Sequence, residues 1–396
     1  MAPAPDLSGT FAVLAASGRD RLYAKPVDSI VARTGEEVGE ALTRLDRALA
    51  SGLHAAGYLT FEAGLALEPR LAALARPLPP ERGPLLWFGL FEGFSDLSED
   101  WTAELEAGAG AVGPADPLIE RQAYAAAFAE VQRLIAAGDV YQINLTFPCR
   151  VPVSGDPVAL YAALRDQARA PHGGIVRTAD RSILSFSPEL FFRRDGQAIE
   201  CRPMKGTATR GASAEKDRLA VAALSDDPKQ QAENLMIVDL LRNDIARICQ
   251  PGSVSVPRLF DVETYPTIHQ MTSTVTGTLR EGIGAEALLR ALFPCGSITG
   301  APKIRATEAI LAVEPEPRGI YTGSIGWFAP DGSAEFNVAI RTLDWPTGAP
   351  FAHYGIGSGV VADSGEASEW RECLAKAEVL TRPQSAPKRT QAPRRS

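Results

Sequence analysis

The chain has 396 residues, of which 45% are hydrophobic and 22% are charged, and its formal net charge is −8. This composition is typical of globular proteins and excludes wholesale disorder or a fibrous repeat. No apolar run reaches the roughly 18 residues that a membrane span needs, and no Lys or Arg precedes the short apolar stretch 11–16 as in a secretory signal. We therefore predict a cytoplasmic protein that does not enter a membrane and has enough apolar surface for two lobes or one large core.

The charges are unevenly distributed. Residues 382–396 contain five basic and no acidic side chains, so the rest of the chain is more acidic than the net charge indicates. An acidic body excludes nucleic acid as a partner, because phosphate binding needs a concentrated Lys and Arg surface. The tail itself, rich in Pro, Gln and Arg, is predicted to be a disordered basic extension.

The cysteines give no sign of a disulfide framework or a structural zinc site. They are odd in number and widely spaced, and no two form a C-x-x-C pair. We expect reduced, mostly buried thiols at Cys149, Cys201, Cys249, Cys295 and Cys373.

A Gly-, Ala- and Pro-rich segment at 104–118 has the composition of a linker or exposed loop. It suggests a division into an N-terminal part, 1–116, and a larger domain, 117–381. After it, apolar residues at helical spacing predict a helix over 122–137, and alternating residues predict a strand over 140–147.

Two Asp-Gly pairs predict β-hairpins. Asp195-Gly196 separates two apolar runs within 182–202, in a register that pairs Arg194 with Gln197 and Glu189 with Arg202. Asp331-Gly332 separates 321–328 from 334–343. Asp227-Pro228 instead has the pattern of a helix start, and apolar spacing of three and four residues continues the helix to 248. Hairpins clustered apart from helices indicate an α+β fold with antiparallel sheets.

Acidic side chains recur on predicted helices. Glu233 lies on the 227–248 helix, and Glu369, Glu372 and Lys376 share one face of a helix at 368–380. Carboxylates of this kind suit a hard cation such as Mg²⁺. From spacing alone, solvated helix faces with ion pairs are the preferred interpretation.

Lys205 stands between Pro203 and Gly206, just beyond a hairpin strand. The predicted register places Glu189 near the same sheet end, and the two side chains meet only if Pro203 and Gly206 bend the chain. A lone Lys in a loop is more often an ordinary surface residue. The glycine-rich segments 296–303 and 355–359 match neither a P-loop nor a dinucleotide motif, although their backbone could approach a small anion.

Together these segments resemble the chorismate-utilising enzyme family. The matching segments follow the family's order: GDVYQINLT (138–146), SPELFF (187–192), RPMKGTATRG (202–211), DPKQQAENLMIVDLLRND (227–244), IHQMTSTV (268–275), GSITGAPKIRA (296–306), RGIYTGSIGW (318–327), NVAIRT (337–342), and GIGSGVVADS with EWREC (355–364, 369–373). The resemblance implies two antiparallel β-sheets packed face to face with helices outside, as in anthranilate synthase component I, and a chorismate site between them.

Position 205 discriminates within the family. The PMKGT of this chain is similar to the aminodeoxychorismate synthase pattern, whereas anthranilate and isochorismate synthases have a small residue in place of Lys205. Where isochorismate and salicylate synthases carry a water-activating Lys, this chain has Gln142. The resemblance therefore implies conversion of chorismate and ammonia to 4-amino-4-deoxychorismate, toward p-aminobenzoate and folate.

The resemblance also implies roles for individual residues. Lys205 would attack ring C2, Glu189 would protonate the leaving 4-hydroxyl, and His269 would face the ring. Arg341 and Tyr321 would bind the enolpyruvyl carboxylate, and Gly357, Ser297, Lys376 and Gln142 would also line the substrate site. Mg²⁺ would lie on Glu233 and Glu372, with Glu369 nearby.

Some features depart from the family or leave alternatives open. Gln230 and Asn234 replace an acid and a His on the metal helix of some relatives, which suggests weaker metal binding, and the L-L-E-S motif of tryptophan-regulated relatives is missing. No glutaminase Cys-His-Glu set is visible, so ammonia is expected from a glutamine amidotransferase subunit or from solution. Anthranilate synthase component I and a non-catalytic chorismate-binding subunit remain the alternatives.

Overall fold

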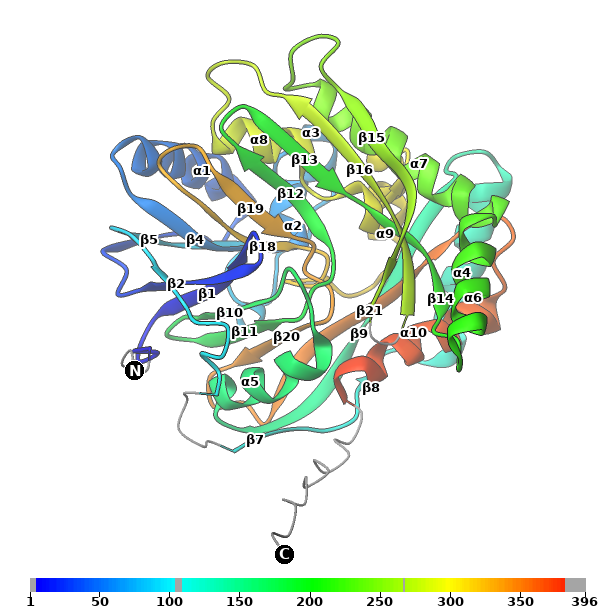
Figure 1. The fold of residues 1–396 in the computed structure, drawn as a ribbon, viewed down its shortest axis with the longest axis horizontal. Helices are drawn as coiled ribbons and strands as arrows, with labels where there is room; N and C mark the ends of the chain where they lie inside the picture. The colour runs from blue at the N-terminus through cyan, green and yellow to red at the C-terminus, as the bar shows by residue number, and fades with distance from the viewer. Residues whose placement is uncertain (1–4, 104–108, 266–267, 382–396) are drawn as a thin grey trace, which may run out of the picture.

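The strands form two large antiparallel sheets in the computed structural model, which describes residues 5–103, 109–265 and 268–381 (Figure 1). The first sheet has the order β17 (Gly300–Ala301), β9 (Gln142–Gly155), β21 (Phe351–Val360), β20 (Thr342–Pro346), β11 (Arg181–Ser185), β10 (Gly174–Arg177), β1 (Phe11–Ala16), β2 (Arg19–Ala24) and β6 (Ser95–Asp96). Two short strands, β7 (Gly110–Val112) and β8 (Asp116–Pro117), also pair with β9.

The second sheet begins at the strand that carries Lys205. Its order is β14 (Met204–Thr209), β16 (Ile268–Thr278), β13 (Ala198–Arg202), β12 (Leu190–Asp195), β19 (Ala334–Asn337), β18 (Ser324–Phe328), β4 (His54–Leu59), β5 (Leu86–Phe91) and β3 (Asp28–Ala32), with β15 (Ser255–Thr264) paired to β16. Strands from both sides of residue 117 lie in each sheet, and the division at that residue stays a prediction.

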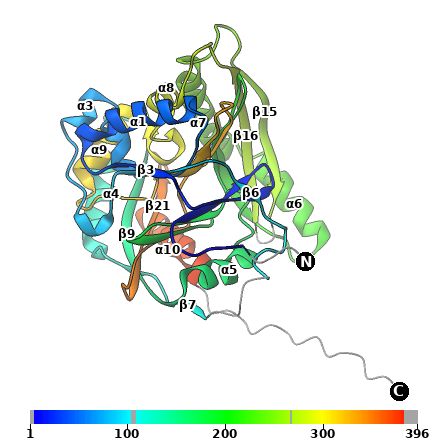
Figure 2. The ribbon, with the colours of Figure 1, turned by 90° about the vertical axis from the view of Figure 1, so that its left-hand side faces the viewer.

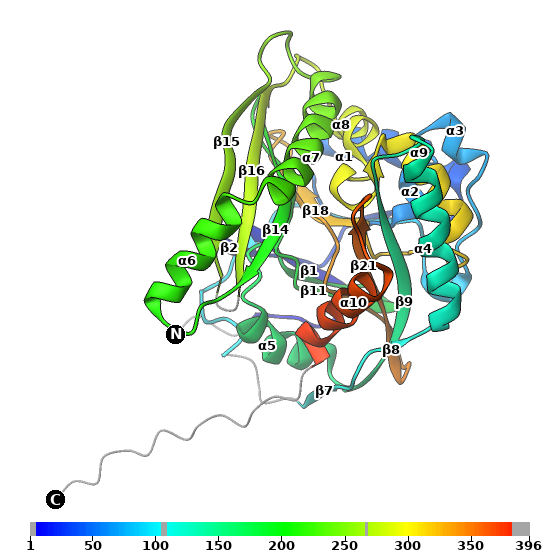
Figure 3. The ribbon, with the colours of Figure 1, turned by 90° about the vertical axis from the view of Figure 1, so that its right-hand side faces the viewer.

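The two sheets face each other and bury aromatic side chains between them. Tyr23 of β2 and Ile183 of β11, from the first sheet, belong to one apolar cluster with Tyr58 of β4 and Trp87 of β5, from the second. This confirms the predicted α+β sandwich, since each sheet has an apolar face that must be covered. Figures 2 and 3 show the sandwich from its two sides, with helices around the sheets.

Two of the helices begin at an aspartate cap. Asp227 accepts hydrogen bonds from the backbone N–H groups of Lys229 and Gln230 at the start of α7, and Asp156 caps α5 in the same way. The helices are α1 (Gly35–Ala50), α2 (Phe61–Leu65), α3 (Pro69–Ala72), α4 (Arg121–Ala136), α5 (Pro157–Ala168), α6 (Ala214–Ser225), α7 (Pro228–Ala246), α8 (Ala285–Leu292), α9 (Lys303–Val313) and α10 (Glu366–Thr381), with short 3₁₀ turns at η1 (Pro80–Arg82) and η2 (Gly296–Ile298).

Most predicted elements are confirmed. The helices expected at 122–137, 227–248 and 368–380 are α4, α7 and α10, the strand at 140–147 opens β9, and both hairpins exist. Within the described residues, no helix is long and apolar enough to cross a membrane. The five cysteines are buried and free, as expected.

Three local predictions were wrong. The first hairpin turns one residue later than predicted, with Asp195 opposite Ala198, and after an irregularity between Leu190 and Arg193 it is Leu190, not Glu189, that lies opposite Arg202. Residues 109–118 contain β7 and β8, because their backbone completes the free edge of β9, so this part is not a linker. Leu235, expected in the apolar stripe of α7, is 43% exposed. The prediction of a disordered tail at 382–396 lies outside the described residues.

A buried guanidinium links several of these elements. Arg318 is 5% exposed and donates to both carboxylate oxygens of Glu314, at 2.8 and 2.7 Å. It also donates to the carbonyl of Asn144 on β9, at 2.7 Å, and to the carbonyl of Ile298 at η2, at 3.0 Å. Buried charges need this degree of pairing, because each unpaired one would carry the full cost of desolvation.

Replacement of Arg318 by Leu should therefore destabilise the protein strongly. It leaves the Glu314 carboxylate buried without its cation, and the free energy of unfolding should fall by about 3–5 kcal/mol. Urea denaturation measures the change. The matched control is Arg305→Leu on α9, where the guanidinium is 41% exposed and pairs with Asp139, and a loss of at most ~1 kcal/mol is expected. Equal losses of unfolding free energy in the two variants would contradict a special stabilising role for the buried Arg318.

Candidate active site

The backbone bend that directs Lys205 is present. β14 pairs with β16, and the register shifts between Met204 and Thr207, which marks a bulge around Lys205 and Gly206. Gly206 has a φ of +93°, a left-handed conformation that suits glycine. The sequence-based expectation of a bend at Gly206 is therefore confirmed.

Lys205 lies beside Gln142 and Gly359. A Cβ placed on Gly359 would stand 3.2 Å from Lys205 Nζ and 3.1 Å from Gln142 Nε2. Burial lowers the pKa of Lys205, and the nearby Lys376 lowers it further, whereas Glu189, Glu233 and Glu372 act in the opposite direction. The polar atoms of the Gln142 side chain are buried and have no hydrogen-bond partner among the described residues.

Glu189 is a buried carboxyl group close to this amine. It is 5% exposed, follows Pro188 between β11 and β12, and burial raises its pKa to about 7. Three groups oppose that rise: the Ser297 hydroxyl, which donates to Glu189 Oε1 at 2.6 Å, the charge of Lys205, and the backbone N–H of Met204. The structure thus brings together Glu189, Lys205 and Ser297, three of the predicted site residues.

The three predicted metal ligands come from two helices. Glu233 is on α7, which packs on β14 and β16, and Glu369 and Glu372 are on α10, which packs on β21. Burial raises the pKa of Glu233, and the charges of Lys205 and Lys229 oppose this rise. Glu369 and Glu372 add to the rise. Glu369 accepts from the Ser364 hydroxyl at 2.7 Å. Among the described residues, no group of three acidic, His or Cys side chains is already assembled as a metal site.

Lys376 connects α10 to the glycine-rich strand. Its Nζ lies 2.7 Å from Glu372 Oε1 and donates to the carbonyl of Gly357 at 3.0 Å. Its side chain is 45% exposed and that of Glu372 is 53% exposed. The pair therefore lies at the open rim of the site, where a ligand can still reach both groups.

Alternate glycines leave the second half of one face of β21 without side chains of its own. Gly355, Gly357 and Gly359 pair with Pro148, Thr146 and Asn144 of β9. Residues two apart point to the same face of a strand. A Cβ at Gly355 would lie 2.1 Å from Tyr321 Cγ, whereas a Cβ at Gly359 would approach Gln142 and Lys205. We call residues 355, 357 and 359 the glycine strip, and it runs from Tyr321 at one end to Lys205 at the other.

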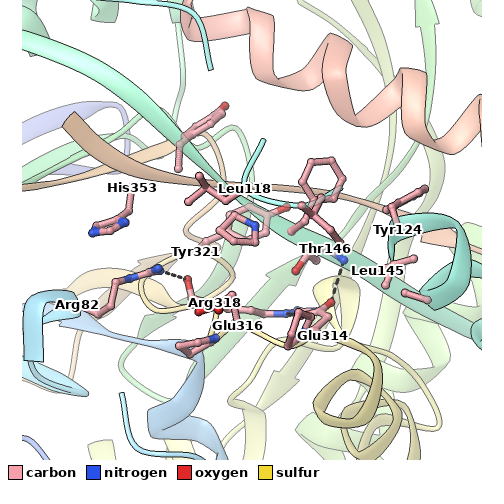
Figure 4. Close-up of a pocket in the computed structure, with 18 of the residues that line it drawn as sticks. Arg82, Leu118, Tyr124, Leu145, Thr146, Glu314, Glu316, Arg318, Tyr321 and His353 are labelled. Atoms are coloured by element: carbon pink, nitrogen blue, oxygen red, sulfur yellow. Dashed lines mark hydrogen bonds and ion pairs between the residues drawn. The ribbon is translucent and has the colours of Figure 1, made fainter. Parts of the chain in front are cut away.

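Tyr321 and Arg341 occupy adjacent but separate surroundings. Tyr321 is 7% exposed and lines a pocket together with Arg82, Tyr124 and His353 (Figure 4). Arg341 is partly buried and has a φ of +51°. Its charge acts to lower the pKa of Tyr354 and Tyr265, against the larger raising effect of burial. Among the described residues, no hydrogen bond joins Tyr321 to Arg341, so their predicted joint carboxylate pocket stays a prediction.

The ring nitrogens of His269 have partners that were not among the predicted site residues. Its Nε2 lies 2.9 Å from Asp217 Oδ1 on α6, and its Nδ1 lies 3.0 Å from Thr264 Oγ1 on β15. Asp217 is held ionised, because a hydrogen bond from Arg210 keeps its pKa far below the usual range. The two ring nitrogens therefore bind α6 and β15, and the geometry gives His269 a role in holding these elements to β16.

Sequence reasoning missed the function of Asn234. This side chain is fully buried, accepts from the Ser273 hydroxyl at 2.5 Å and donates to the carbonyl of Lys205 at 3.4 Å. It therefore fastens the Lys205 strand to α7, one residue from Glu233. The only signal in the sequence was the departure from the His of some relatives, which indicates a difference without revealing a contact.

Comparison with known proteins identifies the family. A sequence profile described as chorismate binding enzyme matches residues 10–382, and the chain belongs to this family. It is 43% identical to aminodeoxychorismate synthase component 1 of Klebsiella aerogenes over 258 residues, which are 65% of this chain and 57% of that protein. It is 37% identical to the component 1 of Bacillus subtilis strain 168 over 295 residues, 73% of this chain and 62% of that protein. The aligned region thus spans less than two thirds of these relatives.

Solved structures support the fold. Anthranilate synthase component I from Streptococcus pneumoniae matches with a TM-score of 0.79 at 24% identity, covering 96% of this chain and 93% of that one. The menaquinone-specific isochorismate synthase MenF from Escherichia coli matches with a TM-score of 0.72 at 17% identity, covering 95% and 89%. The sandwich is therefore the chorismate-binding fold predicted from the sequence.

The glycine strip gives a stability prediction. In Gly355→Ala the new methyl would overlap the Tyr321 ring near its attachment point, where a rotamer change cannot relieve the contact, so unfolding free energy should fall by about 1–3 kcal/mol. Thermal and urea unfolding measure the loss. Gly365→Ala, where a Cβ would meet nothing within 4 Å, is the control and should change stability little. A fully stable Gly355→Ala protein would contradict the close contact.

Proposed function

We propose that this chain is the chorismate-converting component of an aminodeoxychorismate synthase, and that it makes 4-amino-4-deoxychorismate from chorismate and ammonia. The observation that carries the proposal is the placement of the Lys205 amine at the end of the glycine strip, near the buried carboxyl of Glu189. The two groups at this end of the strip are a nucleophile and an acid, the pair that a two-step displacement needs. The product would feed p-aminobenzoate and folate synthesis.

Lys205 supplies the nucleophile. A free Lys with a pKa of about 10.4 costs roughly 4.6 kcal/mol to deprotonate at pH 7, and only the neutral amine attacks carbon. Burial and the charge of Lys376 reduce this cost, because each disfavours the ammonium form. Binding of a dianionic substrate would work against them, so other cationic groups, Lys376 at the rim and the partly buried Arg341, matter for the chemistry as well as for affinity.

Glu189 supplies the proton. Its pKa of about 7 means that a substantial share of the carboxyl is protonated near neutral pH, as a general acid requires. As pH rises above 7 the group ionises and can no longer donate. We therefore expect the reaction to slow on the alkaline side wherever proton donation to the leaving oxygen limits the rate.

The proposed reaction has two displacements. In the first, the neutral Lys205 amine forms a bond to ring C2, the double bonds shift, the C4–O bond breaks, and the departing hydroxyl takes the Glu189 proton and leaves as water. In the second, ammonia forms a bond to C4, the double bonds shift back, and the C2–N bond to Lys205 breaks. The proton lost by the incoming nitrogen returns to Glu189, so the enzyme is regenerated.

The carboxylates on α7 and α10 fit a divalent cation. Their oxygen atoms are the ligands that Mg²⁺ prefers. The three carboxylates are close enough that the charges of Glu369 and Glu372 act to raise the pKa of Glu233. We propose that Glu233 and Glu372 hold the ion, with Glu369 nearby. When bound, Mg²⁺ would supply positive charge for the ring carboxylate of chorismate. Glu372 would then have to share its charge between the ion and Lys376, with which it pairs.

Ammonia is the expected nucleophile for the second step. Gln142 is neutral and cannot act as the base that water would need, whereas ammonia attacks without one. The resemblance implies that a glutamine amidotransferase subunit delivers it, in line with the relatives named as component 1. Cytoplasmic location also stays part of this proposal.

The product identifies the activity. The purified chain, incubated with chorismate, Mg²⁺ and ammonium at alkaline pH, should form 4-amino-4-deoxychorismate, because free ammonia is then abundant. Glutamine in place of ammonium should give no product until an amidotransferase subunit is added. Liquid chromatography with mass spectrometry distinguishes the outcomes: anthranilate with release of pyruvate would favour anthranilate synthase component I, and no product under any condition would favour a non-catalytic binding subunit.

Lys205 tests the covalent mechanism. Lys205→Ala should lose nearly all amination while chorismate binding stays close to that of the wild type, because the proposed ion site and Arg341 remain. Lys205→Arg should not restore the rate, since guanidinium stays protonated. Intact-mass spectrometry of the wild-type chain with chorismate and no ammonia should reveal an adduct at Lys205. Amination by Lys205→Ala at the wild-type rate would overturn the mechanism.

A further inference from the structure

We propose that Ser297 is a positioning residue for Glu189: its hydroxyl orients the carboxyl group and, with the Cys295 thiol, forms a hydrogen-bond chain that serves the carboxyl in both protonation states. The proposal rests on the proposed function, in which Glu189 gives and regains a proton. It changes the role of Ser297, which the family resemblance suggested as a substrate contact.

The geometry places Ser297 behind the acid. Ser297 is in η2 and is 3% exposed, and its Oγ lies 2.6 Å from Glu189 Oε1. On its other side, Oγ lies 3.3 Å from Cys295 Sγ, and that thiol is also buried. A serine hydroxyl has one hydrogen to donate and two lone pairs, and these two neighbours occupy the donor and one acceptor position.

The direction of the chain follows the charge of Glu189. When Glu189 is ionised it can only accept, so Ser297 donates to Oε1 and the Cys295 thiol donates to Ser297. When Glu189 carries its proton on Oε1, the carboxyl donates to Ser297 Oγ, and the serine hydrogen turns toward Cys295 Sγ, a weak acceptor. Buried polar groups thus keep partners in both states, which avoids the cost of an unsatisfied group.

Several other groups face Glu189. Lys205 on β14 favours its ionised form, as does the backbone N–H of Met204. The Cys295 thiol adds no charge, because burial raises its pKa to about 12. Burial is the main influence and favours the protonated acid, and the Ser297 hydrogen bond opposes it. Loss of the hydroxyl should therefore raise the Glu189 pKa above about 7.

A direct titration tests this without reference to turnover. The chain is labelled with ¹³C at the glutamate carboxyl carbon, and the Glu189 resonance is identified by its absence in Glu189→Gln. Between about pH 5 and pH 9, Ser297→Ala should titrate about one pH unit higher than the wild type. Ser297→Thr, which keeps the hydroxyl, should return the midpoint toward the wild-type value. Cys295→Ala, which keeps the Ser297–Glu189 bond, is the matched control and should shift the midpoint less than Ser297→Ala.

Steady-state kinetics separate positioning from substrate contact. In Ser297→Ala the alkaline limb of the kcat/KM profile should move to higher pH with the carboxyl midpoint, kcat should fall, and the KM for chorismate should change by less than about twofold. An unchanged carboxyl midpoint, or a raised KM with an unchanged pH profile, would overturn the proposal. If no variant converts chorismate, the proposed function fails. The carboxyl titration still decides whether Ser297 controls the pKa of Glu189.

Discussion

The buried guanidinium of Arg318 donates five hydrogen bonds, which connect several segments around the candidate site. Two of them hold Glu314, whose Oε1 in turn accepts from the backbone N–H of Thr146, opposite Gly357. One reaches Ile298, the residue after Ser297, and another reaches Thr322, the residue after Tyr321. Displacement of Arg318 would therefore disturb β9, the residue that supports the acid, and one end of the glycine strip together.

Local sequence signals predicted much of the secondary structure. Asp227 before Pro228 fixed the start of α7, and the two Asp-Gly pairs located both hairpins, because caps and tight turns depend on neighbouring residues only. The register of the first hairpin was not predicted, since the turn lies one residue later than the Asp-Gly pair indicated and the pairing of β12 shifts after Leu190 with both β13 and β19. For the same reason the composition of 104–118 did not reveal β7 and β8. Strand pairing depends on distant partners that a local pattern does not contain.

In the site, too, residue types were easier to predict than the positions of their side chains. The residue types of Lys205 and Glu189 were informative in sequence, and the resemblance to chorismate-utilising enzymes gave them roles. What brings them together is a bulge at Gly206, which Pro203 and Gly206 suggested in sequence, together with contacts of Asn234 and Ser297 that the sequence did not reveal. His269, in contrast, matched a family motif, but its ring is bound to Asp217 and Thr264. The predicted orientation of His269 toward the substrate ring therefore stays a prediction.

Because the glycine strip has no side chains of its own, side chains from other elements can approach its backbone closely. The strip itself cannot favour one nucleophile over another. Discrimination must then come from the few side chains at its ends, chiefly Lys205 and Gln142 near Gly359 and Tyr321 against Gly355. This separation lets evolution, or an engineer, change the reaction at the rim without rebuilding the floor. An attempt to alter the chemistry should therefore leave the three glycines intact and vary positions 205 and 142 as a pair.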